Sequence, residues 1–253
     1  MANQYLKYIS DEHLFWCIEN LYQSYTKAKA NITKDKFYKN KIDTFKLIFD
    51  SKFNNLDERT LIKTEIARQI DKSTNNSIGI FHEQILGGIE GFERGNLSGF
   101  DIKAKDNTLF ADIKNKHNTM NSSSAESLFQ KLARYADTYK NAKCYWVQIL
   151  AKKSFKEKWN GEINGKEYSH SRVYKISGDQ FYALLTQNEH AFLELYQVLP
   201  KAIKDFLKEK NQGHKQIDSA IHEIFDSASD EERSILDQIT FENYSYYLGF
   251  KEL

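Results

Sequence analysis

The chain has 253 residues, of which 40% are hydrophobic and 28% are charged, and its formal net charge is +1 at pH 7. These proportions are typical of a soluble globular protein, and the length allows one large domain or one domain with a smaller helical appendage. No apolar run approaches the roughly 20 residues that span a bilayer, and the first residues lack the apolar core of a signal peptide. We therefore expect a cytoplasmic protein with no membrane partner.

Charge and cysteine content narrow the expectation further. Residues 1–175 carry 29 Lys and Arg against 21 Asp and Glu, whereas residues 176–253 carry 7 against 14. A basic first part suggests a polyanionic partner, although lysine-rich surfaces are often only solvated. Cys17 and Cys144 are too few and too far apart for a disulfide framework or a zinc site, so we expect reduced, buried or half-buried thiols.

The first 86 residues are predicted to be mainly helical. Apolar residues recur at helical spacing from Ser10-Asp11 onward, again around 42–49, and then over 57–71 and 77–86. Five of the eleven glycines fall within residues 87–99. They indicate that the last of these helices stops and that the chain turns into the next element.

The chain between residues 99 and 116 is predicted to form a β-hairpin around the turn Asp106-Asn107. Any symmetric loop centred on this turn places Asp101 directly opposite Asp112. Because alternate side chains of a strand share a face, Lys114 lies beside Asp112. The apolar row of the second strand is formed by Leu109, Ala111 and Ile113.

Two facing carboxylates need an explanation, because like charges directly opposite each other destabilise a sheet. A cation between them or enough solvent would relieve the repulsion, and Mg²⁺ suits a site of two carboxylates and several waters. The tripeptide Asp-Ile-Lys occurs twice, however, at 101–103 and 112–114. On these residues alone, a metal site and an ordinary amphipathic hairpin both stay open.

The elements after the hairpin predict a βαβ unit. Ser123 and Glu126 form a capping-box pattern that opens a helix, and residues 144–151 are apolar almost throughout, as in a strand covered on both faces. The two strands flanking this helix are expected to be parallel. Another strand is predicted over 168–176, with one face formed by His170, Arg172 and Tyr174.

The last part of the chain is predicted to be helical and acidic. Ser177 and Gln180 form a second capping-box pattern at its start. Pro200 and residues 212–214 are expected to interrupt the helices, and Ser229 with Glu232 is expected to cap the last one.

An antiparallel hairpin with these acids, followed by a crossover helix and a buried parallel strand, resembles the core of the P-D…(D/E)-x-K nuclease superfamily. Asp101 matches the first acid, with Phe100 where the eponymous proline would stand. Asp112 and Lys114 match the second acid and the lysine. Type II restriction endonucleases that cut the interrupted palindrome GGNCC are similar over longer stretches, namely 99–103, 111–121 and 169–178.

The resemblance implies an α/β fold in which helices flank a mixed central sheet, made of an antiparallel hairpin and the βαβ unit. It also implies a single nuclease domain over residues 1–253. Within this domain we expect a mainly helical N-terminal part (1–86), a catalytic α/β core (87–187) and a helical acidic C-terminal part (188–253).

The activity implied by the resemblance is Mg²⁺-dependent hydrolysis of double-stranded DNA, leaving 5′-phosphates. Asp101 and Asp112 would hold the metal, and Lys114 would orient the attacking water or stabilise charge in the transition state. Many members draw another acid from a preceding helix, and Glu83 is the candidate for this catalytic and metal-binding position. The alternative for Glu83 is an exposed helical glutamate.

DNA recognition is expected to involve Arg172, because guanine's two major-groove acceptors are best met by a bidentate cation. Further candidates are His170, Lys116, His117 and Asn118, for which phosphate contacts or structural roles are commoner. A two-fold symmetric DNA site predicts a homodimer, and a cognate DNA methyltransferase is expected in the same system without a stable complex. A DNA-repair or junction nuclease and a non-catalytic DNA-binding protein stay open as alternatives.

Overall fold

The computed structural model describes residues 3–95, 99–116, 120–208, 216–230 and 234–244. The chain divides into two compact units, one formed by Met1–Leu21 with Ile78–Asn211 and the other by Tyr22–Ser77 with Gln212–Leu253. Two of the unit boundaries fall within the helices α1 (Asp11–Ala30) and α4 (Glu58–Gly87). In the described part of the chain, no helix is both long and apolar enough to cross a membrane.

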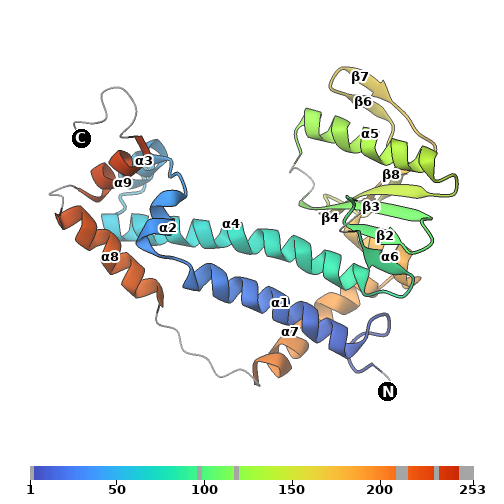
Figure 1. The fold of residues 1–253 in the computed structure, drawn as a ribbon, viewed down its shortest axis with the longest axis horizontal. Coiled ribbons are helices and arrows are strands. Elements are labelled where there is room, and N and C mark those ends of the chain that lie inside the picture. Colours follow the sequence, from blue (N-terminus) through green and yellow to red (C-terminus); the bar gives the residue numbers. More distant parts are fainter. Residues whose placement is uncertain (1–2, 96–98, 117–119, 209–215, 231–233, 245–253) are drawn as a thin grey trace. The chain divides into compact units, whose positions relative to one another are not determined.

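A six-stranded mixed sheet with the order β1-β2-β3-β4-β8-β5 forms the centre of the first unit (Figure 1). Neighbouring strands are antiparallel from β1 to β3, parallel from β3 through β4 to β8, and antiparallel again between β8 and β5. The predicted α/β fold with a mixed sheet is therefore confirmed. The strands are β1 (Phe92–Arg94), β2 (Ile102–Ala104), β3 (Leu109–Lys116), β4 (Lys143–Leu150), β5 (Lys156–Lys158) and β8 (Val173–Ser177).

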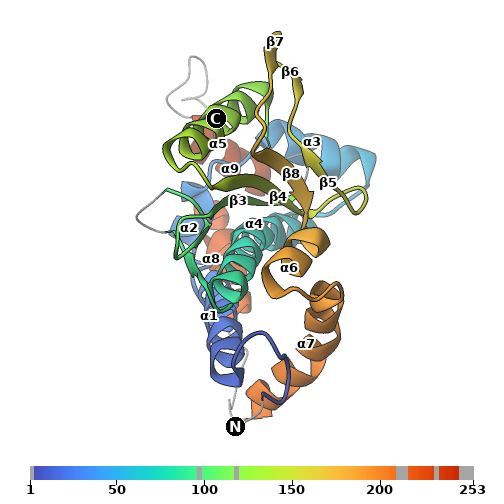
Figure 2. The ribbon, with the colours of Figure 1, turned by 90° about the vertical axis from the view of Figure 1, so that its right-hand side faces the viewer.

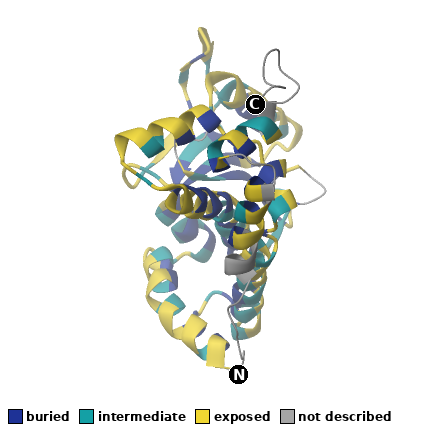
Figure 3. Ribbon diagram, turned by 90° about the vertical axis from the view of Figure 1, so that its left-hand side faces the viewer, coloured by how far each residue is buried: buried dark blue, intermediate teal, exposed yellow. Residues whose placement is uncertain are grey.

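Helices cover both faces of this sheet, with α5 (Ser122–Thr138) on one side and α6 (Gly178–Thr186) on the other (Figures 1 and 2). Side chains on alternate positions of the strands therefore enter two different apolar layers. Phe110 and Cys144 pack toward α5 with Leu128 and Leu132. The inner strands β3, β4 and β8 are largely buried, whereas the edge strand β5 and the outward helix turns are exposed (Figure 3).

The central strand β4 has the composition that a strand covered on both faces requires. Six of its eight residues are buried or, for Trp146, partly buried, and the two residues at its ends are exposed. Tyr145 packs against Phe181 of α6 with ring centroids 5.9 Å apart and the rings tilted by 54°. The predicted buried strand and parallel βαβ crossover are confirmed, and Cys17 and Cys144 are free and buried as expected.

The hairpin of β2 and β3 has the predicted register. Ile102 is paired with Ala111, so Asp101 stands opposite Asp112. The turn is closed by the backbone N–H of Asn107, which donates to the Ala104 carbonyl at 2.9 Å, and Asn107 itself has a positive φ of 60°. Asparagine tolerates this left-handed conformation better than most residues, which is why this turn sets the register.

Helix α4 is continuous where the sequence predicted two helices, 57–71 and 77–86. The polar segment between them contains no glycine or proline, and its side chains bond within the helix. Ser73 donates to the Gln69 carbonyl at 3.3 Å, and Ser77 donates to the Ser73 carbonyl at 3.2 Å. Such bonds to the preceding turn satisfy the side chains without ending the helix.

The predicted strand over 168–176 is also wrong in extent. Its first residue ends β7 (Lys166–Tyr168), which pairs with β6 (Gly161–Ile163) in a separate two-stranded sheet. Its last residues form β8, and the turn between them is held by the N–H of Arg172, which donates to His170 Nδ1 at 3.1 Å. His170 and Arg172 therefore do not share a strand face with Tyr174.

The capping residues differ from the predicted boxes. Asn121, not Ser123, caps α5 by accepting from the N–H of Ser124 at 2.8 Å. Glu126 instead accepts from Asn164 at 3.0 Å and from Tyr168, and so binds the β6–β7 hairpin to α5. Ser177 does cap α6 by position, but its hydroxyl bonds Asp179 and the Phe155 backbone rather than completing a box.

Two further boundaries near the C-terminus differ from the prediction. Helix α7 (Ala191–Lys208) continues through Pro200, and Ser229 lies inside α8 (Gln216–Asp230). Ser234 caps α9 (Ile235–Tyr244) by accepting from the Asp237 N–H at 3.1 Å. Residues 212–214 and Glu232 lie outside the described part of the chain.

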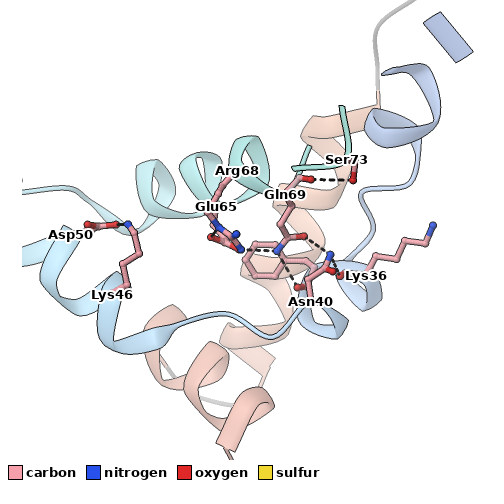
Figure 4. A network of polar contacts seen from close by, with 9 residues as sticks. Lys36, Asn40, Lys46, Asp50, Glu65, Arg68, Gln69 and Ser73 are labelled. Carbon is pink, nitrogen blue, oxygen red and sulfur yellow. Dashed lines mark hydrogen bonds and ion pairs between the residues drawn. The ribbon is translucent and has the colours of Figure 1, made fainter. Parts of the chain in front are cut away.

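The second unit packs α2 (Lys34–Lys39), α3 (Thr44–Phe53), α8, α9 and the first part of α4 around a separate apolar core, and it also includes the end of α1. A polar network ties α4 to α2 (Figure 4). Buried Glu65 accepts from Arg68 at 2.6 Å and from Gln69 at 2.9 Å, and Gln69 accepts from Asn40 at 3.0 Å. Because every buried polar group here has a partner, the network costs little stability.

Candidate active site

The ends of β2 and β3 hold two aspartates in fixed positions. The backbone N–H of Asp101 donates to the Ala111 carbonyl at 3.0 Å, and Asp101 Oδ2 accepts from the N–H of Ile113 at 2.6 Å. Asp101 is thus anchored to β3 by both its backbone and its side chain. Asp112, opposite Asp101 in the register, is buried with a side chain only 12% exposed.

The Asp101 carboxyl is difficult to ionise. Burial, together with the negative charges of Asp112 and Glu83, raises the pKa of Asp101 to about 6 against the opposing effects of the Ile113 N–H and Lys114. The repulsion expected from facing carboxylates is therefore present. A bound cation would relieve it.

Removing the Asp101 charge is expected to stabilise the protein. A carboxyl pKa raised from 3.8 to about 6 contributes stability that is fully present below pH 3.8 and is lost as the pH rises through 6. After allowance for partial exposure, the ionised group costs about 1–2 kcal/mol at pH 7. We expect Asp101→Asn to raise the free energy of unfolding by about this amount at pH 7, because Asn can still accept from Ile113.

Urea unfolding without divalent ions, at pH 7 and at pH 4, measures this effect. The gain of Asp101→Asn over the wild type should shrink toward zero at pH 4, where Asp101 of the folded protein is already protonated. A variant that is no more stable than the wild type at pH 7 would contradict the assignment of the raised pKa.

Two lysines contact Asp112, one at each carboxylate oxygen. Lys114 Nζ pairs with Asp112 Oδ1, and Lys131 Nζ lies 3.3 Å from Oδ2. Lys131 comes from α5, donates to the Gly99 carbonyl, and lies 4.1 Å from the centre of the Phe100 ring. The sequence prediction missed Lys131. The available signal was its place at the margin of the apolar stripe of α5, between Leu128 and Leu132.

The second Asp-Ile-Lys copy, at 112–114, differs from the first in its surroundings. Lys103 of the first copy pairs with Glu93 of β1 at 3.0 Å, whereas Lys114 pairs with Asp112. The lysine of the first copy therefore pairs with a glutamate of the neighbouring strand, and the lysine of the second copy pairs with the aspartate of its own tripeptide.

A pocket of about 570 Å³ opens over Asp112 between β3 and α5. Its walls carry a carboxylate, two ammonium groups, a carboxamide and three hydroxyls, a set that suits an anionic, hydrogen-bonding ligand together with a cation. The lining residues are Asp112, Lys114, Met120, Asn121, Ser123, Ser124, Ser127, Leu128 and Lys131.

The donor atoms fit a hard cation such as Mg²⁺. Asp101 and Asp112 offer only oxygen, and Mg²⁺ is commonly held by one or two carboxylates with waters completing its shell. Glu83 of α4 is near enough to raise the Asp101 pKa, but its carboxylate accepts from Arg94 at 2.8 Å. Among the described residues, no group of three or more His, Cys, Asp or Glu side chains could hold one ion.

The described candidate DNA-contacting residues do not line the pocket over Asp112. Arg172 donates to the Tyr139 carbonyl at 3.2 Å and to the Lys140 carbonyl, and His170 Nε2 lies 3.1 Å from Asp137 Oδ1. Tyr139, which Arg172 contacts, lies about 12 Å further along the helix than Lys131, which contacts Asp112. The structure therefore does not bring Arg172 together with the carboxylates. Lys116 is exposed at the end of β3, and His117 and Asn118 lie outside the described residues.

The sheet topology, with two facing acids and a lysine beside the second on the central hairpin, defines a restriction-endonuclease-like nuclease fold. Residues 6–208 match the family model described as Eco47II restriction endonuclease. The chain belongs to the Eco47II restriction endonuclease family and is a site-specific, DNA-cleaving hydrolase of type II. Of the functions that the sequence left open, type II restriction endonuclease is confirmed.

Two relatives support this membership. Type II restriction enzyme Sau96I of Staphylococcus aureus is 42% identical over 261 aligned residues, covering 99% of this chain and all of that enzyme. Type II restriction enzyme Eco47II of Escherichia coli is 30% identical over 218 residues, covering 81% of this chain and 89% of that enzyme.

Proposed function

We propose that the protein hydrolyses double-stranded DNA at GGNCC, with Mg²⁺ as cofactor, and leaves 5′-phosphate ends. The observation that carries the proposal is the pairing of Asp101 opposite Asp112 with the Lys114 ammonium on Asp112. The choice of GGNCC is supported by the likeness of residues 99–103, 111–121 and 169–178 to enzymes that cut this sequence.

Each residue of the site has a chemical role in this proposal. Asp101 and Asp112 hold the cation, and Asp101 is kept in place by Ile113. Mg²⁺ held by these two acids would polarise the phosphodiester and make water more acidic. Lys114 orients the attacking water and stabilises the added negative charge as water oxygen bonds to phosphorus. The bond from phosphorus to the 3′ oxygen breaks, and that oxygen leaves with a proton.

Further contacts are proposed around this centre. Arg172 contacts guanine on moving from the carbonyls at the end of α5, and His170, Lys116, His117 and Asn118 contact DNA nearby. Glu83 supplies a third acid if Arg94 releases it. The two-fold symmetry of GGNCC favours a homodimer, acting in the cytoplasm beside a DNA methyltransferase that does not form a stable complex with it.

Digestion of a DNA of known sequence tests the proposal. With Mg²⁺ we expect discrete fragments whose ends all map to GGNCC and which ligate without prior phosphorylation. The same reaction with excess EDTA should yield no fragments. Ends that map to another sequence would overturn the choice of GGNCC, and cleavage in EDTA would overturn the cofactor.

A further inference from the structure

Asp112 is the only carboxylate of the proposed metal pair that contacts two ammonium groups in the described part of the chain. Lys114 occupies one oxygen and Lys131 the other, the latter at 3.3 Å. With Asp101 and Asp112 ionised, the two acids and the two lysines balance one another without any bound ion. The site of the DNA-free protein therefore carries its own counterions.

This balance opposes a divalent cation. A cation bound at Asp112 meets two positive charges at close range, in a place where the Asp112 side chain is 12% exposed and that of Lys131 is 28% exposed. Charges this near each other interact strongly when water is partly excluded. When the cation binds Asp112, the two lysines lose their negatively charged partner. A DNA phosphate in the same pocket supplies a negative charge in its place.

Lys131 is well placed for such an exchange. Its long side chain lines the pocket over Asp112 together with Ser124 and Ser127, and its second partner, the Gly99 carbonyl, is a neutral acceptor that water can replace. Lys114 is adjacent to the same carboxylate from the strand side. Lys131 thus approaches the pocket from the helix, on the side that the strand residues do not cover.

We propose that Lys131 is a further active-site residue. Its ammonium group pairs with Asp112 in the DNA-free protein and pairs with a DNA phosphate instead when substrate binds. The proposal rests on the proposed function, and it makes DNA and cation binding cooperative, each raising the affinity for the other. Lys131 then acts twice, by keeping the cation site weak without substrate and by contacting the substrate phosphate during cleavage.

Calorimetric titration of Mg²⁺ into the DNA-free protein tests this role without any cleavage. Lys131→Met should bind Mg²⁺ about tenfold more tightly than the wild type, because one partly screened opposing charge is gone. Lys131→Arg should keep the wild-type affinity. Single-turnover cleavage by Lys131→Met should fall about a hundredfold, because a phosphate contact in the transition state is lost.

Arg134→Met is the matched control, because Arg134 is an exposed cation one turn further along α5. It should leave Mg²⁺ affinity unchanged. If thermal melts show that Lys131→Met is unfolded, Lys131→Gln takes its place, since the amide can still donate to Gly99. Mg²⁺ affinity that is unchanged or weaker in the folded uncharged variant would overturn the proposal.

Asp112→Asn separates this inference from the proposed function. If Asp112→Asn loses Mg²⁺ binding while Lys131→Met behaves like Arg134→Met, the carboxylate site stands and only the role of Lys131 fails. If Asp112→Asn binds Mg²⁺ and cleaves DNA like the wild type, the proposed site itself fails and the role of Lys131 fails with it.

Discussion

Asp112→Ala is expected to abolish DNA cleavage while leaving specific DNA binding largely intact. Asp112 is the acid on which the lysines of the pocket converge, and it faces Asp101 across the hairpin. Its loss removes a cation-holding oxygen donor and several kcal/mol of transition-state stabilisation, which corresponds to a rate decrease of about a thousandfold or more. Binding should survive because most protein–DNA hydrogen bonds go to the DNA backbone and come from many residues.

Single-turnover cleavage and gel-shift binding on one duplex measure the two effects separately. Asp106→Ala is the control, because Asp106 lies on the same hairpin but only caps its turn, accepting from the Thr108 N–H at 3.0 Å. This control should cut at the wild-type rate. Unchanged cleavage by Asp112→Ala would refute the assignment of the site, and loss of binding together with cleavage would assign Asp112 a structural role instead.

The local parts of the site could be predicted from the sequence. The turn at Asp106-Asn107 and the two-residue period of a strand together determine which side chains face each other, so Asp101 and Asp112 were paired correctly. The apolar composition of residues 144–151 also predicted a buried strand. Each of these features depends on residues close together in the chain, where spacing and turn chemistry suffice.

Contacts between elements could not be predicted in this way. Lys131 reaches Asp112 only because α5 packs over β3 at one rotation and height, and no spacing within α5 specifies that position. Glu126 followed the capping-box pattern, yet its carboxylate binds the distant β6–β7 hairpin. Arg172 likewise contacts the end of α5, since its backbone turns at 169–172 rather than continuing the expected strand.

The duplicated Asp-Ile-Lys gives the sharpest comparison, because one chain carries the same tripeptide in two neighbouring strands. Lys114→Met is expected to lower the single-turnover cleavage rate by about a hundredfold to a thousandfold, since its ammonium is the strand-side cation over Asp112. Lys103→Met removes only a partly exposed ion pair with Glu93, which costs about 0.5 kcal/mol of stability. It should therefore cleave at the wild-type rate.

Both lysines have the same two preceding residues, so the variants differ only in the position of the lost charge. Lys103 is 24% exposed and Lys114 is 35% exposed, and the more exposed lysine is the one expected to matter. If burial decided the effect, Lys103, the less exposed of the two lysines, would be the more important for cleavage. Equal losses of cleavage in the two variants would therefore assign the effect to the general charge of the hairpin, and a larger loss for Lys103→Met would place the catalytic lysine on β2.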